Sequence, residues 1–219
     1  MSFEKFLRFC LHLIPSRYSS EQSRKPTGWF GRNIITYILS RSNYSLIDFM
    51  QSLYKGQKSD VIADIGFGPG ILFPMLENKA AKLVGIDFSE DMILLAQKKY
   101  KKLIRDGRLE LKNASIASLP YPNEYFDAIF SANTIYFWPD PEQNAREVLR
   151  VLKPGGKFIV GFATKEQLEK VNPEPDIFKL YSSADVETLL KKAGFSETQS
   201  FSKKEPQVGK DSYCVVGRK

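Results

Sequence analysis

Three glycines and two acids stand at spacings that suit the binding of a nucleoside. The segment 61–70, Val-Ile-Ala-Asp-Ile-Gly-Phe-Gly-Pro-Gly, predicts a buried strand and then a turn with glycine at every second position. A second predicted strand, 82–87, ends in Asp87, seventeen residues after Gly70. A glycine turn lets the backbone approach a ligand closely, and an acid at the tip of the second strand can hold a ribose diol. The pattern therefore predicts a cofactor that carries a nucleoside.

The spacing of the glycines narrows the choice of cofactor. The dinucleotide fingerprint is G-x-G-x-x-G, whereas Gly66, Gly68 and Gly70 follow G-x-G-x-G. With Asp64 two residues ahead of the first glycine, the pattern resembles motif I of the class I S-adenosylmethionine-dependent methyltransferases. A nucleotide-dependent oxidoreductase is disfavoured because the third glycine does not stand at the dinucleotide spacing.

The resemblance extends from Val61 to about Phe162 and is to the methyltransferase type 11 group, relatives of the ubiquinone/menaquinone-biosynthesis methyltransferases. The further matching motifs, in chain order, are 119–122, Phe126-Asp127, Asn133, 136–140 and 150–156. The segment 25–31 also resembles one found ahead of motif I in some bacterial members. Residues 1–60 and 164–182 match no specific substrate subgroup.

The whole chain of 219 residues predicts an α/β fold in which strands alternate with helices. Strands are expected near 61–65, 82–87, 109–113, 126–132, 157–163, 196–202 and 212–218. We expect a Rossmann-like, seven-stranded, mostly parallel sheet with an antiparallel last strand, helices on both faces and a helical N-terminal extension. Residues 1–57 would form that extension or lid, and residues 58–219 the S-adenosylmethionine-binding methyltransferase domain.

Local signals place several helix ends. Ser89 and Asp140 are expected to cap the helices that follow them, and Gly194 to end a helix over 183–193. An amphipathic first helix ends at Pro15, and the polar stretch 16–27 leads from it to Gly28-Trp29-Phe30-Gly31. Further helical patterning is expected from Arg32 to about Leu53.

The resemblance implies a role for each matching residue. The methionine part of S-adenosylmethionine would face Asp64, Gly66, Phe67, Gly68, Gly70 and Asn133, with Asp64 and nearby backbone anchoring its amino and carboxylate ends. The nucleoside would face Asp87 through its ribose hydroxyls and Phe88, Ser115 and Ile116 through its adenine. Because relatives often carry an Asp where Ser115 stands, we expect backbone and stacking to hold the adenine.

Some of these residues also have a purely structural interpretation. Asp64 could brace the turn, and Phe88 could be ordinary packing. The aromatic run Tyr136-Phe137-Trp138 fits either the core or a substrate pocket.

Methyl transfer from a sulfonium neutralises the charge on sulfur, so it depends mainly on alignment and on the exclusion of water. A base is needed only if the acceptor must lose a proton. The only histidine, His12, lies on the polar face of the first predicted helix and is not a compelling base. The catalytic residues therefore stay unknown, with Tyr18, Tyr136 and Tyr181 as candidates for touching the acceptor. Cys10 and Cys214 lack metal-ligand spacing, and we expect no metal.

A small-molecule acceptor fits best. Exocyclic-amine methyltransferases of DNA carry N-P-P-Y/F after the fourth strand, but residues 133–136 hold no proline, so nucleic acid is disfavoured. The net charge of +7 is interpreted as a solubility background. The N-terminal helices and 165–180 are expected to cover the pocket, and the aromatic residues of the extension favour an apolar or aromatic acceptor.

The alternative function is a non-catalytic cofactor-binding or membrane-surface regulatory protein, suggested by the amphipathic first helix. A peripheral membrane contact through that helix therefore stays open. The absence of a convincing signal peptide and of a long apolar run predicts a cytoplasmic protein. The sequence does not determine the oligomeric state.

Overall fold

The structure is a computed structural model that describes residues 16–170, 172–205 and 211–219. The predicted first helix, with Cys10 and His12, lies outside the described residues. Within them, no helix is both long and apolar enough to cross a membrane.

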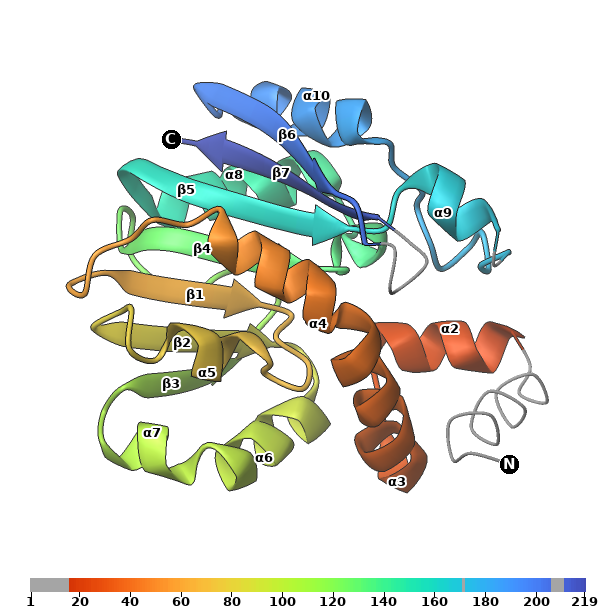
Figure 1. The fold of residues 1–219 in the computed structure, drawn as a ribbon, viewed down its shortest axis with the longest axis horizontal. Helices are drawn as coiled ribbons and strands as arrows, with labels where there is room; N and C mark the ends of the chain where they lie inside the picture. The colour runs from red at the N-terminus through yellow and green to blue at the C-terminus, as the bar shows by residue number, and fades with distance from the viewer. Residues whose placement is uncertain (1–15, 171, 206–210) are drawn as a thin grey trace.

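A seven-stranded sheet runs through the molecule in the order β3-β2-β1-β4-β5-β7-β6 (Figure 1). The strands are β1 (Val61–Ile65), β2 (Lys82–Asp87), β3 (Leu109–Asn113), β4 (Phe126–Ala132), β5 (Leu152–Phe162), β6 (Glu197–Lys203) and β7 (Ser212–Arg218). The first five pair in parallel, while β7 lies antiparallel between β5 and β6. The predicted Rossmann-like sheet with an antiparallel last strand is confirmed.

The fifth strand begins earlier than the sequence predicts. Leu152 already pairs with Phe126, and a register shift then places Lys157 opposite Ala128. Gly155 lies inside this irregularity with a φ of +75°, a conformation that glycine adopts without strain. The preceding helix thus ends at Val151, three residues before Pro154, and the Pro-Gly-Gly sequence forms a bulge within β5.

Helices cover both faces of the sheet. They are α2 (Ser16–Arg24), α3 (Gly28–Phe30), η1 (Gly31–Ile35), α4 (Thr36–Ser52), α5 (Leu72–Leu76), α6 (Glu90–Lys99), α7 (Lys101–Arg105), η2 (Ile135–Phe137), α8 (Pro141–Val151), α9 (Lys165–Glu169) and α10 (Ser183–Ala193). Figure 1 shows α4 in front of the sheet, with α8 and α10 behind it. One apolar cluster joins α4, α5 and α6 to the front face, and a second joins α8 and α10 to the back face.

The helix α4 packs on the sheet rather than standing apart from it. Leu46, Ile47, Phe49 and Met50 are buried in the same cluster as Ile159 of β5. The end of the predicted extension thus shares its core with the sheet, and the domain boundary at residue 57 stays a prediction.

Two of the predicted helix ends are confirmed. At the third, the start of α6, the predicted capping hydrogen bond does not form. The Asp140 carboxylate accepts a hydrogen bond from the Gln143 backbone N–H at 3.1 Å, and Gly194 ends α10 with a φ of +106°. Ser89 occupies the cap position of α6, but its hydroxyl donates to the Pro26 carbonyl at 3.4 Å instead of accepting from the helix. The expected cap is thus a tertiary contact to the N-terminal segment.

The polar stretch 16–27 forms helix α2 although it has no apolar stripe. The end of the helix is held by Gln22, which is buried and exchanges two hydrogen bonds with Thr27, at 3.0 Å to its N–H and 3.1 Å to its hydroxyl. Tertiary contacts therefore stabilise a helix that hydrophobic periodicity does not indicate.

Candidate functional site

A cavity of about 230 Å³ lies at the carboxyl ends of β1, β2, β3 and β4. The loops that follow these strands line it from one side, and the inner face of α4 lines it from the other. The chain adds β2 and β3 on one side of β1 and adds β4 and β5 on the other, so the topological switch point lies between β1 and β4. Open α/β sheets bind their ligands at this position.

The turn after β1 forms one wall of the cavity. Gly66 and Gly68 line it with φ angles of +72° and +50°, and the Gly66 N–H donates to the Ile86 carbonyl at 2.7 Å. A Cβ atom on Gly66 would lie 2.4 Å from the Thr134 methyl group, whereas one on Gly68 would meet no atom within 4 Å. Gly66 is therefore required both by its backbone angle and by the close approach of the loop after β4.

Gly70, the third glycine of the motif, is not among the residues that line the cavity. Its carbonyl accepts a hydrogen bond from the Tyr100 hydroxyl at 2.6 Å. A Cβ atom there would lie 2.8 Å from the rings of Phe73 and Tyr100. Gly70 therefore serves the packing of α5 and α6 under the turn, and its contact with the cofactor stays a prediction.

Asp87, at the tip of β2, is buried and connects the two turns. Its carboxylate accepts hydrogen bonds from the Gly68 N–H at 3.0 Å and from the Ser89 N–H at 2.9 Å. Burial raises the pKa of Asp87, and the bonds from Ser89 and Gly68 act in the opposite direction. Each carboxylate oxygen keeps acceptor capacity beyond these bonds, so Asp87 can receive two donors from the cavity.

Asp64 is the second acid of the cavity and has no hydrogen bond from its side chain to any other residue that the structure describes. Only 6% of its surface is exposed. Burial, reinforced by the neighbouring charge of Asp87, raises the pKa of Asp64 to about 8. A buried carboxyl group without a partner favours a ligand that brings a positive charge.

The loops after β2 and β3 form the far end of the cavity. Phe88 is 41% exposed, and the Lys25 ammonium lies 5.5 Å from the centre of its ring. Ser115 and Ile116 also line this end, and the Ser115 hydroxyl accepts from the Ala117 N–H at 3.2 Å. Phe88 and Ile116 thus offer apolar surface suited to a flat ring.

The N-terminal segment reaches the same end of the cavity. Ser23, Arg24 and Pro26 line it, and the bond from Ser89 to the Pro26 carbonyl ties the segment to α6. The sequence predicted that the N-terminal helices cover the pocket, but it did not single out Ser23, Arg24 or Pro26, because the cofactor motifs begin only at Val61.

Asn133 lies after β4 with a φ of +55° and joins three parts of the chain. Its Oδ1 accepts from the Ala163 N–H at 3.2 Å and from the Tyr136 hydroxyl at 2.9 Å. Its Nδ2 donates to Asn43 Oδ1, on α4, at 3.0 Å. Because a backbone N–H can only donate, this chain of bonds fixes the orientation of both amides.

Asn43 lines the cavity from α4, together with Leu39 and Ile47 one turn before and after it. Its oxygen is occupied by Asn133, so its Nδ2 donors are the polar groups left for a ligand. Sequence reasoning also missed Asn43, because a lone asparagine in an amphipathic helix carries no motif.

The structure places none of the three candidate tyrosines in the lining of the cavity. Tyr136 is 3% exposed, and its hydroxyl is engaged by Asn133 and Ala163. Tyr181 packs against the apolar cluster on the back face, and Tyr18 is 41% exposed with its ring 6.1 Å from that of Phe30. The contact of these tyrosines with the acceptor stays a prediction, and none of the three has a place in the lining that supports it.

The three aromatic residues after β4 were expected either in the core or in a substrate pocket, and the structure divides them between the two. Tyr136 belongs to the core, whereas Phe137 and Trp138 line the cavity. The Trp138 ring N–H donates to the Thr134 hydroxyl at 3.1 Å, which holds the indole in place.

The segment after β5 that was expected to cover the pocket does not contact the cavity directly through its described residues. No residue of 165–180 that the structure describes lines the cavity. Instead, Asp176 pairs with Arg17 of α2 at 2.8 Å, and Glu174 accepts a hydrogen bond from the Ser16 hydroxyl. This segment therefore supports α2, which leads into the residues that do line the cavity.

No group of three or more His, Cys, Asp or Glu side chains in the described ranges could hold a metal ion. The fold and the cavity together define a Rossmann-like protein with a cavity at the carboxyl edge of its sheet, where such folds bind nucleosides.

Comparison with known proteins makes the class specific. A methyltransferase domain family of type 11 matches residues 63–160. The uncharacterized methyltransferase YdaC of Bacillus subtilis is 27% identical over 85% of this chain and 98% of its own length. The ubiquinone/menaquinone biosynthesis C-methyltransferase UbiE of Geobacter sulfurreducens is 36% identical over 46% of this chain and 37% of its own length.

Among solved structures, a SAM-dependent methyltransferase from Aquifex aeolicus shares the fold, with a TM-score of 0.66 and 24% identity over 82% of this chain and 92% of that one. The chain belongs to the class I S-adenosylmethionine-dependent methyltransferases of the type 11 group. It is therefore an enzyme whose family uses S-adenosylmethionine as methyl donor.

Proposed function

We propose that this enzyme transfers a methyl group from S-adenosylmethionine to a small apolar or aromatic molecule. The observation that carries the acceptor class is the apolar wall that α4 and the loop after β4 give the cavity. Leu39, Ile47, Phe137 and Trp138 form this wall, and Asn43 stands between them as a polar group. The UbiE relative is named for ubiquinone and menaquinone biosynthesis, which agrees with an acceptor of this kind.

The cofactor would lie across the ends of β1 and β2. Asp87 would accept hydrogen bonds from the ribose hydroxyls, and Phe88, Ser115 and Ile116 would flank the adenine. Gly66, Phe67, Gly68 and Asn133 would face the methionine part. Asp64 would pair with the cofactor's ammonium group, which suits a buried carboxyl group that lacks a protein partner.

Bound in this way, the cofactor supplies a methyl group on a positively charged sulfur. The protein's own contribution is to align the acceptor and to exclude water, which can remove much of the barrier without acid-base chemistry. Among the described residues that line the cavity, the titratable groups are Asp64, Asp87 and Arg24. Because both acids are assigned to the cofactor, a proton released by a phenol or quinol acceptor would pass to solvent water.

Asn43 would orient the acceptor. Its oxygen is held by Asn133, so its N–H donors can bind an oxygen of the acceptor, such as a hydroxyl or carbonyl. A donor held in an apolar wall fixes the orientation of a ligand that the wall alone would leave free.

The test is a methyl-acceptor screen with labelled S-adenosylmethionine. Phenols, quinols and apolar amines form one arm, and polar acceptors of similar size form the other. The proposal predicts methylated product, identified by mass, in the first arm alone. Transfer confined to the polar arm would contradict the acceptor class while leaving the enzyme class intact.

A separate titration addresses the cofactor. Calorimetry should show binding of S-adenosylmethionine and S-adenosylhomocysteine, and no binding of NAD. Cofactor binding without transfer to any acceptor of the panel would favour the non-catalytic alternative, a cofactor-binding regulatory protein.

A further inference from the structure

A row of positive charges covers the outer face of α6 and α7. Lys98, Lys101, Lys102 and Arg105 are exposed. Lys98 lies one turn after Leu94 on α6, and Lys101 and Lys102 lie four and three residues before Arg105 on α7, so each helix presents its charges on one face. Backbone bonds from the Tyr100 N–H to the Ala96 carbonyl at 2.8 Å and from the Ile104 N–H to the Tyr100 carbonyl at 3.1 Å join the two helices at Tyr100, where the regular helix is interrupted. We call this face, Leu94 to Arg105, the basic stripe.

The charges of the basic stripe are largely unneutralised. Arg105 pairs with Asp106 at 3.2 Å, but Lys98, Lys101 and Lys102 have no acidic partner within 4 Å in the described part of the chain. On α10, by contrast, Lys191 has Glu187 at 3.8 Å. Like charges held close together repel one another, so the stripe favours an anionic partner.

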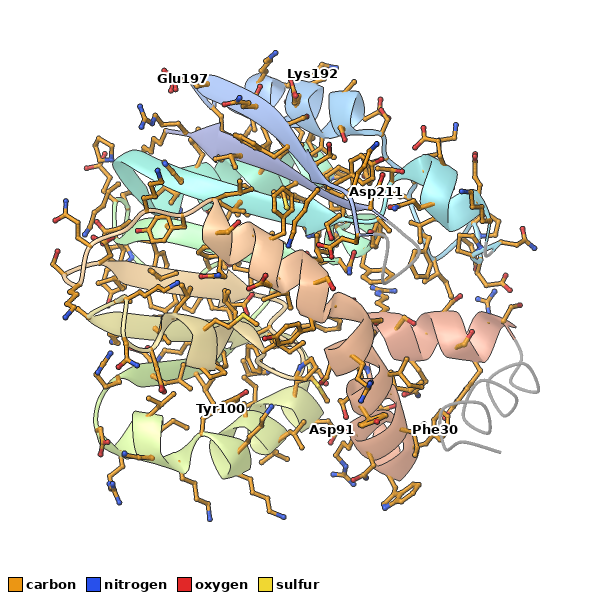
Figure 2. The ribbon with its side chains drawn as sticks, viewed as in Figure 1. Phe30, Asp91, Tyr100, Lys192, Glu197 and Asp211 are labelled. Carbon is orange, nitrogen blue, oxygen red and sulfur yellow. The ribbon has the colours of Figure 1, made fainter. Side chains whose placement is uncertain are left out.

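Apolar side chains are exposed at one end of the basic stripe. Leu94 is 57% exposed and Trp29 of α3 is 69% exposed. The helix α3 is tied to the start of α6, because the Gly28 N–H donates to Asp91 at 3.0 Å and Arg32 pairs with the same carboxylate at 3.4 Å. Figure 2 shows Asp91 and Phe30 at this end of the molecule, far from Lys192 and Glu197.

We propose that the basic stripe, together with Trp29 and Leu94, docks this protein on an anionic lipid bilayer. Lysine ammonium groups are attracted to anionic headgroups, and tryptophan favours the boundary between headgroups and acyl chains. The exposed tryptophan and leucine favour a bilayer over nucleic acid, because phosphate backbones alone offer them no apolar layer to enter. This surface differs from the first helix, which lies outside the described residues.

The docking surface lies close to the cavity. Its relevance to methyl transfer rests on the proposed function. Phe88 lines the cavity two residues ahead of α6, and Pro26 and Arg24 line it just ahead of α3. The cavity end and the docking surface therefore adjoin. A docked enzyme would hold the nucleoside end of its cavity beside the bilayer, where apolar acceptors concentrate.

Co-sedimentation with vesicles tests the docking without any acceptor. The full chain should bind phosphatidylcholine vesicles that contain phosphatidylglycerol, and raised salt should weaken the binding. The triple variant Lys98→Gln/Lys101→Gln/Lys102→Gln should bind about a hundredfold more weakly, since each basic residue near an anionic surface is worth about a fivefold change. Lys99 is left unchanged because it donates to the Pro69 carbonyl under the cofactor turn.

A matched control uses lysines at the opposite end of the molecule. The variant Lys191→Gln/Lys192→Gln should bind the same vesicles as the unchanged protein does. Both variants should keep the affinity for S-adenosylhomocysteine, which shows that they are folded. Equal loss of vesicle binding in the two variants would show a general effect of net charge and would overturn the docking surface.

Fluorescence gives a second readout, because the chain has two tryptophans and Trp138 is only 3% exposed. Docking should shift the emission of Trp29 to the blue, and the variant Trp29→Tyr should abolish that shift. Equal binding to pure phosphatidylcholine, or binding to RNA but not to anionic vesicles, would also contradict the proposal. Neither result bears on methyl transfer, which the acceptor screen measures separately.

Discussion

The two walls of the cavity are built in different ways. The wall at the ends of β1 and β2 consists of a glycine turn and of Asp87, whose carboxylate holds backbone N–H groups of both loops. The wall formed by α4 and the loop after β4 consists of side chains, and its link is the amide pair Asn43 and Asn133, ninety residues apart. The first wall is made by local backbone geometry, and the second by contacts between distant segments.

This difference determines how many amino-acid substitutions each wall can tolerate. A backbone wall tolerates few substitutions, because the turn demands positive φ angles and close approach. A side-chain wall can change its residues while the helix and sheet that carry them stay in place. We therefore expect the first wall to fix the cofactor and the second to set the acceptor.

Gly66→Ala should lower the stability of the protein more than the other variants, because Gly66 lies where the two walls meet. The new Cβ would combine a φ of +72° with an approach of 2.4 Å to Thr134. Backbone strain and overpacking together should lower the free energy of unfolding by about 2–4 kcal/mol. Urea denaturation measures this loss.

Two further variants separate strain from crowding. Gly68→Ala meets no atom within 4 Å, so it should show the strain of positive φ alone. In the Gly66→Ala background, Thr134→Ser removes the crowding methyl but keeps the hydroxyl that Trp138 uses, and it should recover part of the lost stability. Equal losses for Gly66→Ala and Gly68→Ala would mean that the close approach does not matter.

Asp87→Ala should have the second largest effect, which is a loss of affinity for the cofactor. A hydrogen bond to a charged group is worth about 1.5–3 kcal/mol, so the loss of one to two ribose bonds should lower the affinity for S-adenosylhomocysteine by about tenfold to several hundredfold. Calorimetry on the folded variant measures the change. Its exposed neighbour Glu90, replaced by Ala, is the control and should bind normally.

Asp64 gives the cofactor wall a pH dependence. Burial raises its pKa from an unfolded value of 3.8 to about 8, so the ligand-free protein holds the proton near neutral pH. Pairing with a cationic ammonium group needs the carboxylate, so the affinity for the cofactor should rise about tenfold or more from about pH 6 to about pH 8.

The sign for stability is the opposite. Because the folded pKa lies above the unfolded one, the folded state binds the proton more tightly, and the free energy of unfolding of the ligand-free protein should fall as pH rises from about 4 to about 8. Asp64→Asn should flatten both dependences. A pH profile of binding that is unchanged in Asp64→Asn would place the titrating group elsewhere.

Asn43→Asp should have the smallest effect of these variants, and it should change the binding of the acceptor rather than of the cofactor. Aspartate keeps an oxygen for Asn133 but removes the N–H that faces the cavity. The loss of one hydrogen bond, worth about 0.5–1.5 kcal/mol, should raise the KM for the acceptor by about twofold to twelvefold. The affinity for S-adenosylhomocysteine should stay within about twofold.

Asn43→Ala removes the oxygen as well and leaves the Asn133 amide without its partner. It should therefore disturb both the acceptor and the cofactor. If Asn43→Asp and Asn43→Ala change cofactor affinity to the same extent, Asn43 belongs to the cofactor wall and the contrast between the walls is wrong at this residue.

The cofactor wall could be predicted because its signals are local. A buried strand, a glycine turn and Asp87 are read within one βαβ unit, and nine of the ten expected cofactor residues line the cavity, Gly70 being the exception. Gly70 could not be separated from its neighbours, because a glycine that faces a ligand and one that faces Tyr100 look alike in sequence.

The second wall could not be predicted in the same way. Tyr136 was expected near the acceptor, but its hydroxyl satisfies the Asn133 side chain and the Ala163 backbone inside the protein. Asn43 and residues 23–26 reach the cavity only through the packing of α4 and α2. Such contacts depend on tertiary arrangement, which neither periodicity nor motif spacing encodes.

The position of β7 between β5 and β6 has a consequence for how the chain is made. During synthesis β5 remains an open sheet edge, and β6 has no strand beside it, until residues 212–218 have left the ribosome. The five parallel strands can assemble earlier, whereas the last third of the sheet must close in one late, long-range step. Nascent chains stalled before β7 would therefore expose an unpaired β5, the point at which we expect chaperones to bind or aggregation to begin.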